Sequence, residues 1–197
     1  MLNTLFASLL LVGLSNCKKS EMMSVKESDA AVTSSMAGNG AAQNPKHYEA
    51  HIEALNNSGV SGTAMLTLDG EMLTVEITAT GLEPHKTHAQ HIHGFTENNK
   101  NASCPGMKAD TDGDGLISIG EGLPFYGPVL IALTPFQTPG ADGMIHYMQT
   151  FDLSGGNTVS PLQTRAIVLH GLTVNGTYIG SLPVGCAQIK SANGNGQ

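Results

Sequence analysis

Two histidines have the spacing of metal ligands, and a third lies in a separate apolar segment. His91 and His93 are two residues apart. On an extended strand such residues point to one face, while Ile92 between them points toward the core. His170 ends a second apolar segment, residues 165–170. Three imidazoles that meet from two strands suit copper or zinc. The sequence therefore predicts a metal site, and the alternative is that these histidines are hydrogen-bonded parts of the scaffold.

Residues 110–121 have the pattern of a twelve-residue calcium-binding loop. Carboxylates stand at positions 1, 3 and 5, a glycine at position 6 allows a sharp turn, and a glutamate at position 12 can bind through both oxygens. With a backbone carbonyl at position 7 and a serine at position 9, the predicted calcium ligands are Asp110, Asp112, Asp114, Leu116, Ser118 and Glu121. Because prolines and glycines flank the loop, we expect it to be inserted into another fold without the usual helix pair. The alternative is an acidic, solvated turn.

The N-terminus has the pattern of an export signal. Residues 4–13 form an apolar run that is too short to span a bilayer and right for the core of a signal peptide. Cys17 follows, where a bacterial lipoprotein signal places the cysteine that carries lipid after cleavage. We therefore predict an extracytoplasmic, membrane-anchored lipoprotein, periplasmic or at the cell surface. The alternative is a secretory signal with an incidental cysteine, and in both cases the mature protein leaves the cytoplasm.

Export permits a disulfide bond. Once Cys17 carries lipid, the remaining cysteines are Cys104 and Cys186, and we predict that they pair with each other. The alternative, two free buried thiols, is uncommon outside the cytoplasm. In the chain-entropy model a disulfide that closes a loop of this size stabilises the fold by about 4 kcal/mol.

Composition predicts one domain rich in strands and turns. The 197 residues include 24 glycines and 9 prolines but no tryptophan. The net charge of -7 argues against nucleic acid or an anionic membrane surface as a partner, so we expect membrane contact only through a lipid anchor at Cys17. The predicted segments are a signal peptide at 1–16, a flexible tether at 17–44, the domain at 45–190 and a flexible tail at 191–197.

Strands must position the histidines. Apolar and polar residues alternate at 63–68 and 72–79, and Asp69-Gly70 between them indicates a hairpin turn. Further strands are predicted at 47–55, 88–94, 128–133, 144–153, 165–170 and 184–189. No segment has a convincing helical pattern. We predict an all-β, antiparallel sandwich or barrel of about eight strands, with the calcium loop inserted into it.

Together these motifs resemble the copper/zinc superoxide dismutases and their divergent secreted relatives. The resemblance covers about residues 61–189 and rests on His-x-x-His-x-His-Gly, a cysteine about ten residues later, Arg-x-x-Val-x-His and a late Gly-Cys. It implies a Greek-key sandwich of eight strands. It also implies copper ligands at His91, His93 and His170, an intrasubunit disulfide between Cys104 and Cys186, and a structural role for His88.

The departures from the family concern zinc and charge. In the family a further histidine bridges copper to zinc, and two histidines and an aspartate hold the zinc. Here no histidine lies between His93 and His146. We therefore predict no zinc at the family position and a copper site of three histidines, with His146 or solvent as the fourth ligand. The family also guides its anionic substrate with basic residues, whereas residues 171–185 contain no lysine or arginine. A positive funnel raises encounter rates about 10-fold or more, so its loss argues against fast dismutation.

Other soft or nitrogen ligands are assigned to the scaffold. Methionine sulfur can bind cuprous copper, but the residues in question, Met22, Met23, Met36, Met65, Met72, Met107, Met144 and Met148, are scattered through the predicted tether and strands. We expect them to fill space. We expect His47, His51 and His85 to be hydrogen-bonded parts of the scaffold.

Three functions remain open. In the first, copper at the three histidines dismutates superoxide, and calcium at 110–121 fixes the loop at the mouth of the site. In the second, the same histidines buffer or deliver copper without turnover, which the missing basic residues favour. In the third, the domain is a calcium-stabilised structural or interaction module, because chordin-type relatives of this sandwich lack the dismutase site. The resemblance favours the first, with superoxide or the copper ion as partner. The sequence does not indicate the oligomeric state.

Overall fold

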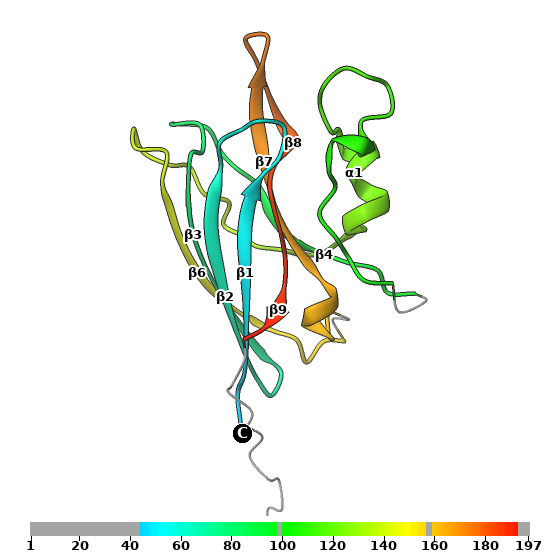
Figure 1. Cartoon of the computed structure of the whole chain (residues 1–197). Helices are drawn as coiled ribbons and strands as arrows, with labels where there is room; N and C mark the ends of the chain where they lie inside the picture. The colour runs from blue at the N-terminus through cyan, green and yellow to red at the C-terminus, as the bar shows by residue number, and fades with distance from the viewer. Residues whose placement is uncertain (1–43, 98–99, 157–158, 193–197) are drawn as a thin grey trace, which may run out of the picture. The chain divides into compact units, whose positions relative to one another are not determined.

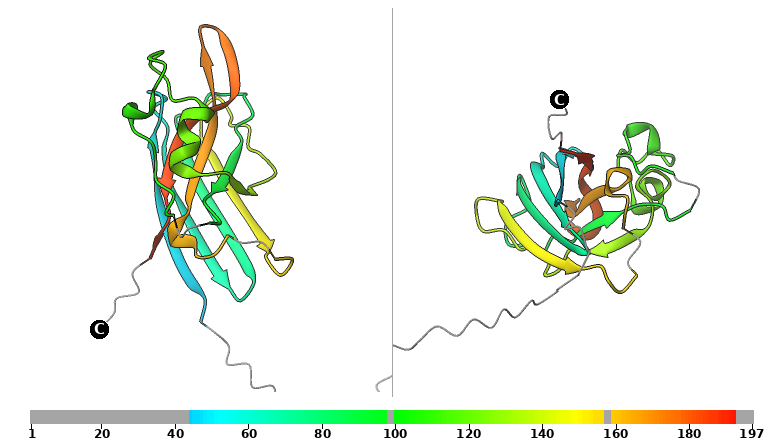
Figure 2. Two further views of the ribbon diagram at one scale, coloured as in Figure 1. Left: turned by 90° about the vertical axis from the view of Figure 1, so that its right-hand side faces the viewer. Right: turned by 90° about the horizontal axis from the view of Figure 1, so that it is seen from below.

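The computed structural model describes residues 44–97, 100–156 and 159–192, which form a mostly β structure (Figure 1). Eight antiparallel strands curl into a half-barrel, whose curvature is visible in the right-hand view of Figure 2. The strands are β1 (Lys46–Ala54), β2 (Ser61–Asp69), β3 (Met72–Thr80), β4 (Gln90–His93), β5 (Val129–Ala132), β6 (Ile145–Asp152), β7 (Ala166–Val174) and β8 (Thr177–Gln188), and a short β9 (Lys190–Ser191) pairs with β1. The helical elements are η1 (Met107–Ala109), α1 (Ile119–Tyr126) and η2 (Leu162–Thr164). The predicted all-β fold of about eight antiparallel strands is confirmed.

The strand order decides which histidines can meet. In the sheet the order is β5-β4-β7-β8-β1-β2-β3-β6. Neighbours that are not consecutive in the sequence, such as β4 and β7, need long connections across the ends of the half-barrel, as in a Greek-key arrangement. The strand that carries His91 and His93 is therefore hydrogen-bonded directly to the strand that carries His170.

The turn of the first hairpin is shifted by one residue from its predicted position. Asp69 pairs with Met72, so the two turn residues are Gly70 and Glu71. Gly70 has φ of 56°, and a glycine at the first turn position is typical of a type II′ turn. The strands keep their predicted faces, because alternate residues of β3 are buried in the core, namely Leu73, Val75, Ile77 and Ala79.

The second hairpin is longer than predicted. The predicted strands at 165–170 and 184–189 are the ends of β7 and β8, which continue to a two-residue turn at Asn175 and Gly176. Both turn residues have positive φ, 48° and 81°, as a type I′ turn requires. An Asn-Gly pair is typical of a two-residue hairpin turn, and here it joins two segments that were predicted as separate strands. Most of the segment between His170 and Cys186 is consequently strand.

The prediction of no helix is wrong for α1. Ser118 caps its N-terminus in a capping box, in which the Ser118 hydroxyl accepts a hydrogen bond from the Glu121 amide and the Glu121 carboxylate accepts one from the Ser118 amide. Pro124 lies inside the helix, and its presence was the reason for expecting a loop. Burial of Tyr126 against the domain and the capping box together outweigh the cost of the proline.

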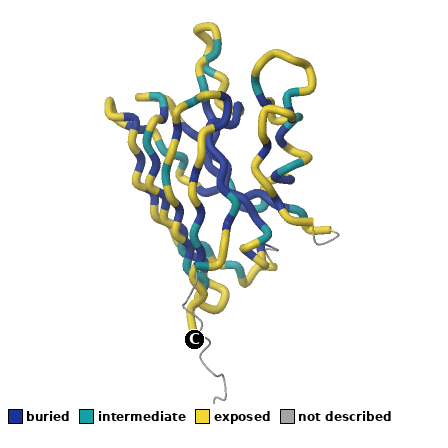
Figure 3. The backbone as a smooth tube through the Cα atoms, in the orientation of Figure 1, coloured by how far each residue is buried: buried dark blue, intermediate teal, exposed yellow. Residues whose placement is uncertain are grey.

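Two clusters of buried side chains surround β7. Inward-facing residues of the sheet form the main core, and its largest members include Leu66, Leu73, Ile77, Ile92, Ile167 and Leu169. A smaller cluster packs Ile117 and Tyr126 against Ala166 and Val168 on the other face of β7. Figure 3 shows the resulting run of buried backbone through the middle of the domain. The segment that contains α1 is therefore a cover over the face of β7 on which His170 lies.

The predicted signal peptide, Cys17 and nearly all of the predicted tether lie outside the described residues, as does most of the predicted tail. Within the part that is described, no helix is long and apolar enough to cross a membrane.

Candidate metal centre

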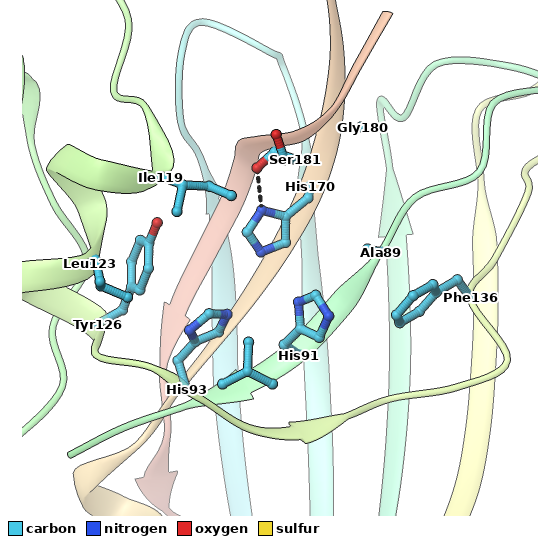
Figure 4. Close-up of a pocket in the computed structure, with 11 residues that line it drawn as sticks. Ala89, His91, His93, Ile119, Leu123, Tyr126, Phe136, His170, Gly180 and Ser181 are labelled. Atoms are coloured by element: carbon cyan, nitrogen blue, oxygen red, sulfur yellow. Dashed lines mark hydrogen bonds between the residues drawn. The ribbon is translucent and has the colours of Figure 1, made fainter.

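The structure brings His91, His93 and His170 together. One ring nitrogen of each lies within 4.8 Å of the corresponding nitrogens of the other two. His91 and His93 project from the same face of β4, and Ile92 between them is fully buried in the main core, as the period of a strand predicts. His170 reaches the group from β7 (Figure 4).

The hydrogen bonds of these rings leave three nitrogens unused. The Nδ1–H of His93 donates to the Gly127 carbonyl and that of His170 to the Ser181 carbonyl, both at 2.8 Å. Each bond fixes the ring and leaves the lone pair of Nε2 free. The buried atoms Nδ1 of His91, Nε2 of His93 and Nε2 of His170 have no hydrogen-bond partner among the described residues. Three unpartnered imidazole nitrogens at one point are a donor set that fits a metal ion.

Burial keeps the three rings neutral. His93 and His170 are each 4% exposed. Removal from water lowers the pKa of both to about 4, because the backbone hydrogen bonds that favour the charged form do not compensate and repulsion between the rings adds to the effect. Burial also lowers the pKa of His91. At pH 7 a metal ion would therefore not compete with protons for these nitrogens.

His88 is a buried histidine that contacts the backbone of His170 and is not one of the three candidate ligands. Its side chain is fully buried, and its ring nitrogens lie 2.9 Å from the His170 carbonyl oxygen and 3.1 Å from the Glu83 carbonyl oxygen. The ring therefore joins the backbone of one candidate ligand to the segment after β3. This placement suits the structural role that the resemblance implies for His88.

His146 is not part of the group. It is exposed on β6, its Nδ1 lies 3.3 Å from Thr78 Oγ1, and its Nε2 lies 3.2 Å from Met144 Sδ. The structure thus corrects the hypothesis that His146 is a fourth ligand beside the three histidines. The register of β6 against β3 directs its side chain to the outer face of the sheet, where Thr78 is its cross-strand partner.

An apolar pocket of about 310 Å³ lies over the three histidines. Its remaining walls come from α1, from the segments around β4 and β5, and from β8, and its lining consists of Ala89, Ile119, Leu123, Tyr126, Val129, Phe136, Gly180 and Ser181 (Figure 4). No lysine or arginine occurs among the described residues that line it. Sequence reasoning missed the contribution of α1, because it did not predict the helix.

Tyr126 adds a phenol hydroxyl to this lining. Its ring centroid is 4.8 Å from that of His93, and burial raises the pKa of its phenol to about 12. The buried hydroxyl has no hydrogen-bond partner among the described residues. Tyr126 therefore offers a neutral O–H at the pocket.

The predicted calcium loop brings only part of its ligands together. One carboxylate oxygen from each of Asp110, Asp112 and Asp114 lies within 4.8 Å of the others. The Glu121 carboxylate instead accepts hydrogen bonds from the Thr111 amide at 2.6 Å and the Ser118 amide at 2.9 Å. These and further bonds to the hydroxyls of Ser118 and Thr111 lower the pKa of Glu121 to about 2. Glu121 thus links the two ends of the loop, and the loop leads directly into α1.

The predicted disulfide between Cys104 and Cys186 is confirmed, with Cα atoms 5.7 Å apart. It attaches the segment that leads to α1 to strand β8. Such a bond indicates an oxidising, extracytoplasmic location.

No model of a known protein family matches the sequence, and no curated protein matches it significantly. The structure itself defines a mostly β, disulfide-bonded domain with a buried three-histidine group and an exposed aspartate cluster, either of which could hold a metal ion.

Proposed function

We propose that the protein binds a copper ion at His91, His93 and His170 outside the cytoplasm and dismutates superoxide there. The observation that carries this proposal is the set of three buried, unpartnered imidazole nitrogens. Three imidazoles suit copper and zinc alike, and the resemblance to the copper/zinc superoxide dismutases favours copper. A copper ion bound there would supply the redox step, taking an electron from one superoxide to release O2 and giving it to a second, which takes up two protons and leaves as H2O2.

The protein residues orient and enclose this site. The Gly127 and Ser181 carbonyls fix the rings of His93 and His170, so that neither of these two rings must rotate before a metal binds. The apolar lining limits water at the open side of the group. Tyr126 keeps its proton at neutral pH, and its ring packs against the ring of His93.

The charge around the pocket sets an expectation for the rate. Because the described lining contains no lysine or arginine and the chain carries a net charge of -7, an anion approaches without electrostatic attraction. We therefore expect dismutation to be slower than in a site with a positive funnel. The same observation favours a second candidate function, in which the three histidines buffer or deliver copper without turnover.

Calcium and a lipid anchor complete the proposal. Asp110, Asp112 and Asp114 would be the first ligands of a calcium ion, and Glu121 would join them by giving up its hydrogen bonds to the loop. Because α1 begins directly after Ser118, calcium at this loop would fix the wall of the pocket. Cys17 would hold the mature protein at a membrane through lipid.

Superoxide decay tests the proposed activity. The mature, disulfide-bonded protein is loaded with copper, and decay is followed directly beside a His170→Gln variant, a control His51→Gln variant and free copper. His51 is exposed on β1, so its replacement leaves the site intact. Rapid decay that His170→Gln removes and His51→Gln preserves is the expected result. Tight copper binding without decay above the His170→Gln background would overturn the dismutase proposal and support copper buffering.

A further inference from the structure

Several methionines are on the surface, which corrects the expectation that they fill space. On β6 and directly before it, Met148 is 64% exposed and Met144 is 37% exposed. Met72 on the neighbouring strand β3 and Met65 on β2 are also exposed. Exposed methionines contribute little packing energy, and two of them, Met144 and Met148, lie close together on and directly before β6 with their sulfur atoms available to a ligand.

Met144, His146 and Met148 lie in one row. The intervening residues Ile145 and Tyr147 are buried in the main core, so the other three side chains point to the outer face by the period of the strand. β6 is the last strand of the sheet, and the row therefore runs along an edge.

Two soft ligand atoms of this row are already neighbours. His146 Nε2 lies 3.2 Å from Met144 Sδ. On the other side of the ring, His146 Nδ1 lies 3.3 Å from Thr78 Oγ1, and when this nitrogen carries the proton, the lone pair of Nε2 faces the sulfur.

Met148 and a carboxylate complete the surroundings. The Cβ atoms of residues two apart on a strand are about 7 Å from each other, and the three rotatable bonds of Met148 can span this distance. Glu76 is the cross-strand partner of Met148 and places a negative charge beside the row. A monovalent cation would thus meet two thioethers, an imidazole and a nearby carboxylate.

We propose that Met144, His146 and Met148 bind one cuprous ion at the surface of the domain. Thioether sulfur and imidazole nitrogen are ligands that Cu(I) prefers, whereas calcium and magnesium require oxygen. This site is separate from His91, His93 and His170, which provide only nitrogen and are enclosed by the pocket. Its position on an exposed edge is suited to taking up Cu(I) from solution or from a donor, and it does not depend on dismutase activity.

The test uses the full mature chain with Ag(I), a monovalent soft ion that does not change oxidation state under these conditions. The chain also carries His170→Gln, so that the three-histidine group does not contribute. Methionine methyl groups labelled with ¹³C are followed by NMR. At one equivalent of Ag(I) we expect the Met144 and Met148 methyl signals to shift, while the exposed Met107 on η1 serves as the internal reference and stays in place.

Matched variants separate this site from general surface binding. Loss of one ligand should weaken Ag(I) binding by roughly 10-fold or more, because replacing a residue that only hydrogen-bonds to a metal ligand already lowers metal affinity by about that factor. We expect this for His146→Gln and for Met148→Leu. His51 lies in the same cross-strand row as His146, with Thr63 and Thr78 between them, and Met65 is a comparably exposed methionine on β2. His51→Gln and Met65→Leu should leave the affinity unchanged.

Competition with a Cu(I) chelator then extends the result to copper itself. Equal weakening by the test and control variants, or no shift at Met144 and Met148, would overturn the proposed cuprous site. In the chain with an intact three-histidine group, His146→Gln should not change superoxide decay. Failure of one proposal is therefore distinguishable from failure of the other.

Discussion

Acid should destabilise the metal-free protein through the same burial that prepares the histidines for a metal. The unfolded chain protonates histidine near pH 6.5, whereas the folded state lowers the pKa of His93 and His170 to about 4. Above pH 6.5 these rings are neutral in both states, so their protonation does not change the free energy of unfolding. Between pH 6.5 and pH 4 only the unfolded state takes up the protons, so stability falls as the pH falls.

The magnitude follows from the difference in pKa. A difference of about 2.5 units corresponds to about 3 kcal/mol for each histidine at pH 4, or about 1.4 kcal/mol per pH unit within the window. Urea unfolding at a series of pH values, with a chelator present, gives this slope. Replacement of His93 by Gln should lower the slope by about 1.4 kcal/mol per pH unit. Replacement of His51 by Gln, which removes an exposed histidine outside the buried group, is the matched control. Identical slopes for the wild-type protein and His93→Gln would refute the claim that burial holds this ring neutral.

Three further perturbations test the surroundings of the site. Replacing both Cys104 and Cys186 by Ser opens a loop of 82 residues, which should cost about 4.5 kcal/mol of unfolding free energy in the chain-entropy model; a loss below about 1 kcal/mol in urea unfolding would contradict it. A methyl group at Gly122 would overlap the ring of Tyr126, which packs against His93, whereas one at Gly120 would meet only the Ser118 hydroxyl at 3.8 Å. Gly122→Ala should therefore weaken copper binding, and Gly120→Ala should not. Calcium at 100 times its dissociation constant should stabilise the fold by about 2.7 kcal/mol, and Glu121→Gln, which keeps the capping box, should abolish most of this gain; an equal gain in the variant would remove Glu121 from the ligand set.

The strand faces and the histidine pair were predictable because they depend on local periodicity. The period of two placed His91 and His93 on one face of a strand with Ile92 on the other, and the structure has this arrangement. Counting cysteines in an exported chain was enough to predict the disulfide. The position of His170 beside this pair depends on the pairing of β4 with β7, which are not consecutive in the sequence. Periodicity does not predict this pairing, and the expectation that His170 joins the pair came from the family resemblance.

The missed features have identifiable physical causes. Ser118 and Glu121 were interpreted only as calcium ligands, and Pro124 favoured a loop, so the capping box and α1 were not predicted. The contact of His146 with Met144 depends on the face that β6 presents, and one residue of register decides this face. The exposure of the methionines follows from the same register. The face of His146 and the exposure of the methionines depend on strand register and could not be read from residue spacing alone, whereas the Ser-x-x-Glu pattern of the capping box was present in the sequence.

The disulfide also affects when the proposed metal site can form. Next to Cys104, the Ser103 amide donates to the Phe125 carbonyl near the end of α1, and two residues further on Gly127 accepts the hydrogen bond that orients His93. Formation of the disulfide in an oxidising compartment therefore holds in place the backbone whose carbonyl orients His93. A chain that is still reduced before export would hold this backbone by packing alone. We expect the centre to reach full affinity only after export, so that the compartment itself determines when, and from which pool, the metal is acquired.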